Sequence, residues 1–410
     1  MSTARDSVRW PILSLGLCFL VALFEGMDVQ SAGIAGPAIA VHFGLSSSMM
    51  GAVFSASIIG LLPGALAGGW LADRLGRKRV LIGAVTIFGV FSLATATIWS
   101  FESLLVVRFL TGVGLGAAMP NLIALACESV EQRSHGRAVS IMYCGLPLGG
   151  VLAVLISNNE LIRELAGYWK AVFYAGGLGP LLVVPLLCLW LPESSAYRAQ
   201  KVLGRSMPNS GWLVLFQQGS ARPTLLLWVS YFFTVMVLYI LQNWLPSLMI
   251  SQGLSRSEAG NVQMALNLGG AVGSLLLGVL LDRWRVMALI VSMYLGTVGA
   301  LVGLGFSTQF YSTMIAAFAA GLFSIGSPLV LYALAPRFYP TSVRGMGVGA
   351  ALAIGRLGAM SGPMVAGQML ATGSGAAMVL MAATPGVAVA AVAMLVLVAG
   401  QDRLTTAQAC

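Results

Sequence analysis

The sequence predicts an all-α membrane protein in which twelve transmembrane helices form two six-helix bundles around a central cavity. Of its 410 residues, 58% are hydrophobic and only 9% are charged. A soluble domain has about a quarter of its residues charged, so these few charges cannot cover a surface that faces water. A bilayer span needs about 20 apolar residues, and a chain of this length has room for about twelve spans with short connections.

Apolar runs near span length recur along the chain, with a polar stretch between the sixth and the seventh. The first six lie at residues 11–36, 48–71, 79–99, 103–126, 137–157 and 169–191. The last six lie at residues 223–250, 258–281, 286–306, 310–333, 345–370 and 375–400. We therefore expect an N-terminal six-helix bundle at 1–192, a cytoplasmic linker at 193–222 and a C-terminal six-helix bundle at 223–410.

The first apolar run shares some features with a secretory signal peptide, because Arg5 and Arg9 precede it and residues 38–40 read Ala-Ile-Ala. A signal peptide, however, has an apolar core of about 7–15 residues. The run in this chain is longer and carries Glu25 and Asp28. We expect it to be the first membrane helix.

The basic residues predict the orientation of the spans. Of the 22 Lys and Arg residues, two lie inside spans and seventeen lie in loops on the N-terminal side. The remaining three, on the opposite side, are Arg163, Lys170 and Arg256. Cytoplasmic loops carry the excess of Lys and Arg, so the N-terminus is expected to be cytoplasmic. An even number of spans places the C-terminus on the same side.

The net charge of +9 does not predict a nucleic-acid partner, because the basic residues are dispersed in short loops rather than clustered. The 5 Cys residues show no paired spacing, which argues against a disulfide framework or a metal site. No cofactor is expected, since the chain has no metal-ligand cluster and no Gly-rich nucleotide loop. The two His residues are too far apart in the expected topology to act together, so the sequence offers no support for an enzyme.

Four charged residues lie inside the expected spans: Glu25, Asp28, Arg108 and Arg356. Each costs about 2.5–3.5 kcal/mol on insertion scales, which makes each a candidate for function. Glu25 and Asp28 share a helix face at i, i+3 spacing, and two close carboxylates in a low dielectric are not expected to ionise together. Arg108 is expected at the depth of Asp28. The two form either a proton-coupling pair, in which protonation of the acid releases Arg108, or a permanent structural ion pair.

Arg356, in the eleventh span, has no acid of its own half at its depth. A buried guanidinium that faces the cavity is suited to bind a carboxylate through two hydrogen bonds. The alternative is that Arg356 binds backbone carbonyls at a kink between Gly355 and Gly358. Aromatic and polar residues of other spans are expected to contact an aromatic ligand or, alternatively, to pack or lie in an interfacial belt. These are Tyr143, Tyr239, Trp244, Asn121, Gln242 and Asn267.

Two motifs recur with a spacing of a little over two hundred residues. Asp73-Arg74 and Asp282-Arg283 each end the second span of a half. The fifth spans open with Gly-Arg-Ala-Val-Ser at 136–140 and Val-Arg-Gly-Met-Gly at 343–347. Parallel six-span halves are typical of rocker-type transporters whose site lies between the halves.

Residues 68–79, Gly-Gly-Trp-Leu-Ala-Asp-Arg-Leu-Gly-Arg-Lys-Arg, resemble the signature loop of the major facilitator superfamily. Residues 108–116 resemble the fourth-span motif of that family. The resemblance implies the major facilitator fold and a cytoplasmic gate, with the Asp73 carboxylate near a helix N-terminus of the other half. The alternative is that these charges only fix the topology. The gate residues expected from the motif and its repeat are Asp73, Arg74, Arg77, Asp282 and Arg344.

Residues 25–28, Glu-Gly-Met-Asp, are similar to the Asp-Gly-x-Asp signature of the aromatic acid:proton symporter family, with Glu25 in place of the first Asp. Longer segments, among them 17–35, 54–69 and 348–363, look like bacterial transporters of 3-(3-hydroxyphenyl)propionate. This resemblance implies proton-coupled import of a small aromatic carboxylate through the bacterial inner membrane, by a monomer. The rival interpretation is a proton-coupled exporter, because residues 145–150 partly match the fifth-span motif of drug:proton antiporters.

Overall fold

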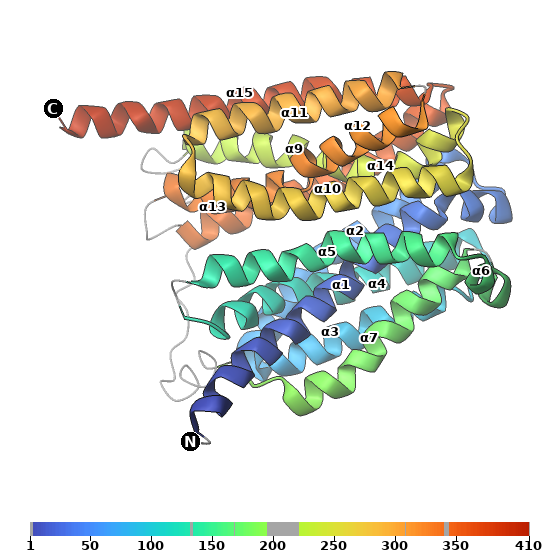
Figure 1. Ribbon diagram of the computed structural model, residues 1–410, viewed down its shortest axis with the longest axis horizontal. Helices are drawn as coiled ribbons and strands as arrows, with labels where there is room; N and C mark the ends of the chain where they lie inside the picture. Colours follow the sequence, from blue (N-terminus) through green and yellow to red (C-terminus); the bar gives the residue numbers. More distant parts are fainter. Residues whose placement is uncertain are drawn as a thin grey trace. The chain divides into compact units, whose positions relative to one another are not determined.

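Each half of the chain folds into its own set of long helices in the computed structural model (Figure 1), with units at Met1–Met207 and Pro208–Cys410. The structure describes residues 3–131, 134–167, 169–194, 221–307, 309–339 and 344–409. Most of the predicted linker, residues 195–220, lies outside this part. Within the described residues, 12 helices are long and apolar enough to cross a membrane, which confirms the predicted number of spans. The chain is therefore a multi-pass membrane protein.

The described part of the first unit contains seven helices, six of them spans, and the short α6 was not predicted. They are α1 (Thr3–Phe43), α2 (Ser47–Leu75), α3 (Arg77–Thr95), α4 (Phe101–Glu128), α5 (His135–Asn158), α6 (Glu160–Ala166) and α7 (Lys170–Trp190). In the second unit the fourth span consists of three consecutive helical segments. The helices are α9 (Ala221–Ser251), α10 (Arg256–Arg283), α11 (Val286–Phe306), α12 (Phe310–Ser324), α13 (Ser327–Leu334), η3 (Ala335–Phe338), α14 (Arg344–Ala371) and α15 (Ala376–Ala409).

Several spans follow short polar loops whose last residue caps the N-terminus of the next helix. Ser46 accepts a hydrogen bond from the Met49 N–H at the start of α2, and Ser100 and Ser255 form capping boxes at α4 and α10. Gly76 alone separates α2 from α3, and its φ of 96° is one that residues with a side chain rarely adopt. These caps satisfy N–H groups that have no partner within their own helices.

The two units share one packing scheme. In the first, α1 packs on α5, α2 on α4, and α3 on α7. In the second, α9 packs on α14, α10 on α12, and α11 on α15. These are the same pairs counted by span, so the sequence repeat corresponds to a structural repeat.

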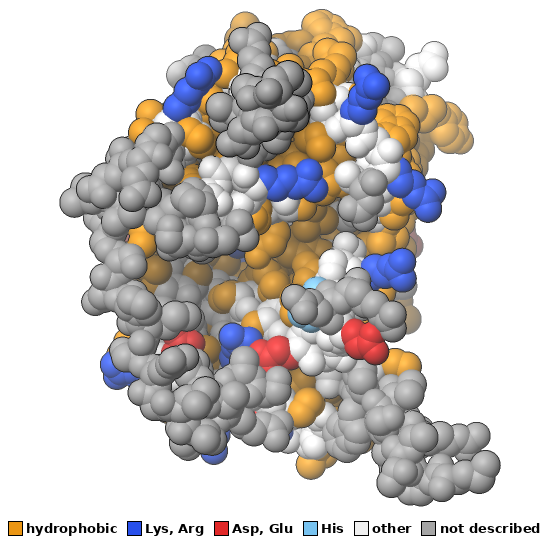
Figure 2. All heavy atoms as spheres, turned by 90° about the vertical axis from the view of Figure 1, so that its left-hand side faces the viewer, with side chains coloured by type: hydrophobic (Ala, Val, Ile, Leu, Met, Phe, Trp, Pro, Cys, Tyr) orange, Lys and Arg blue, Asp and Glu red, His pale blue; other side chains and the backbone are white. Residues whose placement is uncertain are grey.

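Apolar side chains cover much of the outer surface of both units. Leu66, Leu182 and Ile315 are 76%, 73% and 72% exposed, as expected where lipid replaces water. Figure 2, which views the left-hand end of Figure 1, shows Lys and Arg side chains separated by other atoms rather than gathered in one block.

Candidate functional site

Asp28 lies in the middle of α1, where several helices of the first unit meet. α1 packs on α4, α5 and α7, and α3 packs on both α4 and α7. The Asp28 side chain is fully buried among them, with 0% exposed. An ionised carboxylate at such a place requires a cation or several hydrogen-bond donors.

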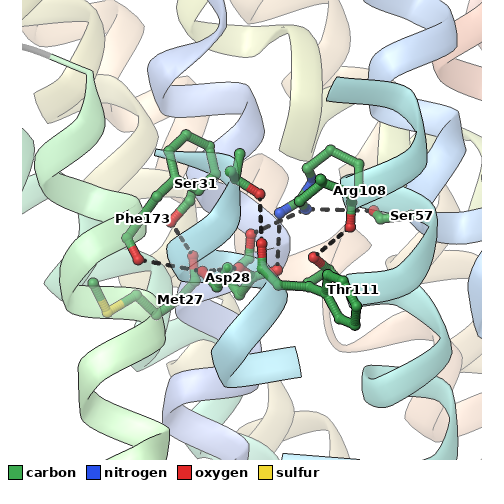
Figure 3. Close-up of polar contacts among 11 residues, drawn as sticks. Met27, Asp28, Ser31, Ser57, Arg108, Thr111 and Phe173 are labelled. Atoms are coloured by element: carbon green, nitrogen blue, oxygen red, sulfur yellow. Dashed lines mark hydrogen bonds and ion pairs between the residues drawn. The ribbon is translucent and has the colours of Figure 1, made fainter. Parts of the chain in front are cut away.

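An ion pair joins Asp28 to Arg108 of α4, as the sequence predicted. Arg108 Nη1 donates to Asp28 Oδ2 at 3.1 Å, and neither side chain is exposed. Arg108 Nη2 donates at longer range to the Asp28 carbonyl oxygen, at 3.5 Å, and to Ser57 Oγ of α2, at 3.4 Å. Figure 3 shows the two charged side chains pointing toward each other, with Ser57 beyond the guanidinium. Removing one partner of such a buried pair costs about 3–5 kcal/mol.

Ser92 of α3 supplies the second contact of the carboxylate. Its hydroxyl donates to Asp28 Oδ1 at 2.6 Å, and the carbonyl oxygen of Phe173 on α7 lies 3.4 Å from the same Oγ. The Phe173 ring centroid lies 5.7 Å from Arg108 Cζ. One carboxylate thus contacts side chains of two other helices, each on a different oxygen.

Close approach of α2 and α4 brings Ser57 within reach of Arg108. At Gly112, one turn beyond Arg108, a Cβ would collide with the Ser57 carbonyl oxygen. At Gly60 it would collide with the Phe109 carbonyl oxygen. Small residues permit this backbone contact, which is a main source of helix association in lipid.

Glu25 lies one turn before Asp28 on α1 and is also buried, with 4% exposed. The i, i+3 spacing places both acids on one face of the helix. Two buried acids therefore lie within one helical turn of each other, and one of them pairs with Arg108.

In the second unit, the structure brings two of the predicted substrate residues together. Arg356 of α14 donates from Nη1 to the Tyr239 Oη of α9 at 3.2 Å, and both residues are partly buried. α9 and α14 pack closely, because a Cβ at Gly358 would collide with the Phe232 carbonyl oxygen. Arg356 and Tyr239 thus form an Arg–phenol pair that joins two spans.

Three of the other predicted substrate residues donate hydrogen bonds from their side chains to backbone carbonyls. Trp244 Nε1 donates to the Pro363 carbonyl oxygen at 3.0 Å, and Asn121 and Asn267 donate to carbonyls one turn earlier in their own helices. The Gln242 carbonyl oxygen accepts from Gln263 at 3.4 Å. Tyr143 lies half-buried on α5.

Among the predicted gate residues, Asp73 and Arg74 are exposed at the end of α2, and the Arg74 guanidinium lies 3.9 Å from the centroid of the Trp70 ring. Arg77 pairs with Glu128, at the end of α4. The side chains of Asp282 and Arg344 lie outside the described part.

Residues that follow α7 complete this end of the first unit and were not predicted. Glu193 accepts hydrogen bonds at 3.0 Å from the N–H groups of Lys78 and Ser194. Ser194 Oγ donates to Glu128 at 2.9 Å. Glu193 therefore caps the N-terminus of α3, where the helix dipole favours a negative charge.

The described residues contain no group of three His, Cys, Asp or Glu that could hold a metal ion.

Comparisons with known proteins agree on one family. The model of the Major Facilitator Superfamily matches residues 18–260 and 227–408. The chain is 50% identical to the 3-(3-hydroxy-phenyl)propionate transporter of Escherichia coli, over 98% of each chain. It is 36% identical to the gallate transporter of Pseudomonas putida, over 98% of this chain and 94% of the relative. It is 35% identical to the 4-hydroxybenzoate transporter PcaK of Pseudomonas putida, over 95% and 92%.

Solved structures share the fold at low identity. The D-xylose-proton symporter matches with a TM-score of 0.73 at 16% identity, over 93% of this chain and 96% of the other. A bacterial homologue of the human lysosomal transporter Spinster matches with a TM-score of 0.73 at 20% identity, over 95% and 97%. These matches confirm the predicted fold class.

Proposed function

Since the chain belongs to the major facilitator superfamily, whose members here are transporters rather than enzymes, we propose that it imports 3-(3-hydroxyphenyl)propionate or a close analogue by proton symport. The observation that carries the substrate class is the 50% identity to the Escherichia coli transporter over 98% of each chain. Relatives at 35–36% identity are named for gallate and 4-hydroxybenzoate. All three named substrates are hydroxylated aromatic carboxylates.

The proton site in this proposal is the buried Asp28–Arg108 pair, with Glu25 beside it. Protonation of Asp28 removes the negative charge that holds Arg108 at 3.1 Å. The guanidinium is then released, and the contact between α1 and α4 weakens. A merely structural pair is replaceable by apolar residues without loss, so a buried charged pair in a membrane span favours a role in coupling.

The substrate carboxylate binds Arg356 in this proposal, with Tyr239 beside it. A guanidinium presents a planar set of donors that matches a carboxylate, and Tyr239 fixes one of its nitrogens at 3.2 Å.

The transport cycle that follows is a rocker-type exchange of access across the bacterial inner membrane. One proton and one monoanion enter together, so net transport is electroneutral. A pH gradient then drives uptake, whereas voltage alone does not.

The test is the uptake of radiolabelled 3-(3-hydroxyphenyl)propionate by cells that express the chain, with and without a protonophore. Accumulation that the protonophore abolishes supports import by symport. Accumulation that rises when the protonophore is added indicates proton-coupled export, the rival interpretation. No transport of this compound in either direction contradicts the proposed substrate.

Membrane vesicles separate the two driving forces. With an imposed pH gradient and no voltage, wild-type vesicles are expected to accumulate the substrate. Uptake that follows voltage but ignores the pH gradient contradicts the electroneutral cycle. Asp28→Asn is expected to abolish the response to the pH gradient, and a variant that still responds to it excludes Asp28 as the carrier.

A further inference from the structure

We propose that Ser92 is a positioning residue for proton uptake, whose hydroxyl holds Asp28 in its ionised, Arg108-paired state and reorganises when Asp28 is protonated. This inference rests on the proposed proton symport and names a further residue that serves it. Ser92 is 0% exposed and lies on α3, a helix with no charged residue near this depth.

The Ser92 hydroxyl has one proton and two acceptors within reach. Asp28 Oδ1 lies at 2.6 Å and the Phe173 carbonyl oxygen lies at 3.4 Å. The shorter distance is the one expected for a hydroxyl that donates to an ionised carboxylate. While Asp28 is ionised, Ser92 therefore donates its hydroxyl proton to Asp28 Oδ1.

Protonation of Asp28 reverses the direction of this hydrogen bond. A hydroxyl accepts as well as donates, so a proton on Asp28 Oδ1 is donated to Ser92 Oγ. The Ser92 proton then turns to the Phe173 carbonyl oxygen on α7. No covalent bond changes, and both states of Asp28 keep a partner. The Ser92 hydroxyl stabilises ionised Asp28 more than protonated Asp28, because hydrogen bonds to charged groups are about twice as strong as neutral ones.

The packing of α7 leaves space for this arrangement. A Cβ at Gly176 would lie 3.2 Å from Ser92 Oγ and 3.9 Å from Asp28 Oδ1. The first distance is tighter than an ordinary van der Waals contact, so an alanine at this position would push against the hydroxyl. Gly176→Ala therefore perturbs the Ser92–Asp28 hydrogen bond without removing either partner.

Among the described residues, few other charges lie near Asp28, and α4 carries Glu102 six residues before Arg108, about 9 Å along the helix. Arg108 of α4 contacts it, and Glu25 lies one turn away on α1. The charges of α2 and α3 lie at the far ends of those helices, with Arg79 roughly 20 Å along α3 from Ser92 at 1.5 Å per residue. α5 is level with Asp28 near Gly149 and Gly150, and its titratable residues Tyr143 and Cys144 lie nearer the start of that helix. α7 carries Lys170 and Tyr174 in the half that contains Gly176.

The test is the pH dependence of the initial rate of 3-(3-hydroxyphenyl)propionate uptake, measured for the wild type and four variants. Ser92→Ala removes the donor that favours ionised Asp28. We expect the pH of half-maximal uptake to rise by about one pH unit, equal to about tenfold in proton concentration. Gly176→Ala is expected to raise the pH of half-maximal uptake as well, but by less than Ser92→Ala. Ser92→Thr restores a hydroxyl and is expected to keep the wild-type profile.

Ser31→Ala is the matched control. Ser31 lies on α1 one turn beyond Asp28, is 0% exposed, and donates to the Met27 carbonyl oxygen of its own helix at 2.7 Å. The same substitution at the same burial, without a bond to Asp28, is expected to leave the pH profile unchanged.

An unchanged profile for Ser92→Ala overturns the proposal, whatever its maximal rate. If Ser92→Ala does not reach the membrane, an unchanged pH profile for Gly176→Ala overturns the proposal instead. A wild type whose uptake is independent of pH overturns the proposed symport and this inference with it. A pH-dependent wild type with an unshifted Ser92→Ala overturns the role of Ser92 alone.

Discussion

At the scale of single residues, a double-mutant cycle tests whether the buried pair of Asp28 and Arg108 serves only stability or also proton coupling. Arg108→Gln leaves an uncompensated carboxylate at a position with 0% exposure. We expect the purified variant to lose about 3–5 kcal/mol of stability, since one charge of a buried pair then has no partner. The thermal unfolding midpoint in detergent measures this loss.

The double variant Asp28→Asn, Arg108→Gln separates structure from coupling. It removes both charges and keeps neutral groups of similar shape, so its unfolding midpoint is expected to recover toward the wild type. Its uptake is expected to lose all response to a pH gradient. A double variant that still couples uptake to protons shows that the pair is structural.

A second prediction concerns the phenol next to Arg356. Tyr239→Phe removes the oxygen that accepts from Arg356 Nη1 at 3.2 Å. The guanidinium keeps its charge but loses one orienting contact, so KM for the substrate is expected to rise about tenfold, the effect of losing one hydrogen bond to a charged group. The maximal rate is expected to change little.

Initial rates over a range of substrate concentrations measure both constants. Arg356→Lys is the comparison, because a lysine keeps the charge without the planar donor set, and we expect it to raise KM further than Tyr239→Phe. A Tyr239→Phe variant with an unaltered KM contradicts a role for the phenol in binding.

The residues of the site differ in how far the sequence could predict them. Asp28 and Arg108 were predictable as a pair, because a charge inside an apolar run is rare and costly, and helix depth places them together. Ser92 and Ser57 were not, since a single hydroxyl in an apolar helix is common and usually bonds its own backbone. The contact between Ser92 and the Phe173 carbonyl oxygen could not be predicted either, because every residue has a backbone carbonyl.

At the scale of helices, the close contact between α1 and α5 depends on glycine. A Cβ at Gly149 would collide with the Leu23 carbonyl oxygen, and a Cβ at Gly26 would collide with the Leu146 backbone. Gly149→Ala therefore forces the two helices apart. We expect a loss of about 1–3 kcal/mol, typical of overpacking, seen as a lower unfolding midpoint.

Gly83→Ala is the control for helix propensity. Gly83 is exposed on α3, and an added Cβ there meets nothing within 4 Å. Alanine favours a helix over glycine by about 1 kcal/mol, so this variant is expected to be neutral or slightly more stable. A Gly149→Ala variant as stable as Gly83→Ala shows that α1 and α5 do not need this contact.

The helices themselves follow from length and hydropathy, whereas their ends depend on polar contacts. The predicted spans match the helices to within several residues at most ends. α1 continues through Gly36 and Pro37 to Phe43, beyond the predicted end at residue 36, and stops before Gly44, whose φ is 62°. The short α6 begins at Glu160 after an Asn, in a polar loop that has no apolar period. The Glu193 contact with α3 could not be predicted, since it joins residues 115 apart in sequence.

At the scale of the whole molecule, the sequence repeat explains why the spans of both halves pack in the same order. In each unit the first span packs on the fifth, the second on the fourth, and the third on the sixth. The charges inside the spans do not follow the repeat: the first unit holds Asp28 and Arg108 as a pair, whereas the second holds Arg356 against a phenol. We infer that the fold is shared by the halves and the chemistry is divided between them.

The last prediction concerns orientation. Seventeen of the 22 Lys and Arg residues lie on the N-terminal side of the expected spans, and the positive-inside rule then places both termini in the cytoplasm. A fluorescent protein fused after residue 410 is expected to fluoresce, and alkaline phosphatase fused there is expected to be inactive. Phosphatase inserted into the loop between α5 and α7 is expected to be active, because that loop follows an odd number of spans. A reversed pattern would place Asp73 and its basic neighbours on the outer side, where the cytoplasmic gate expected from the family resemblance could not operate.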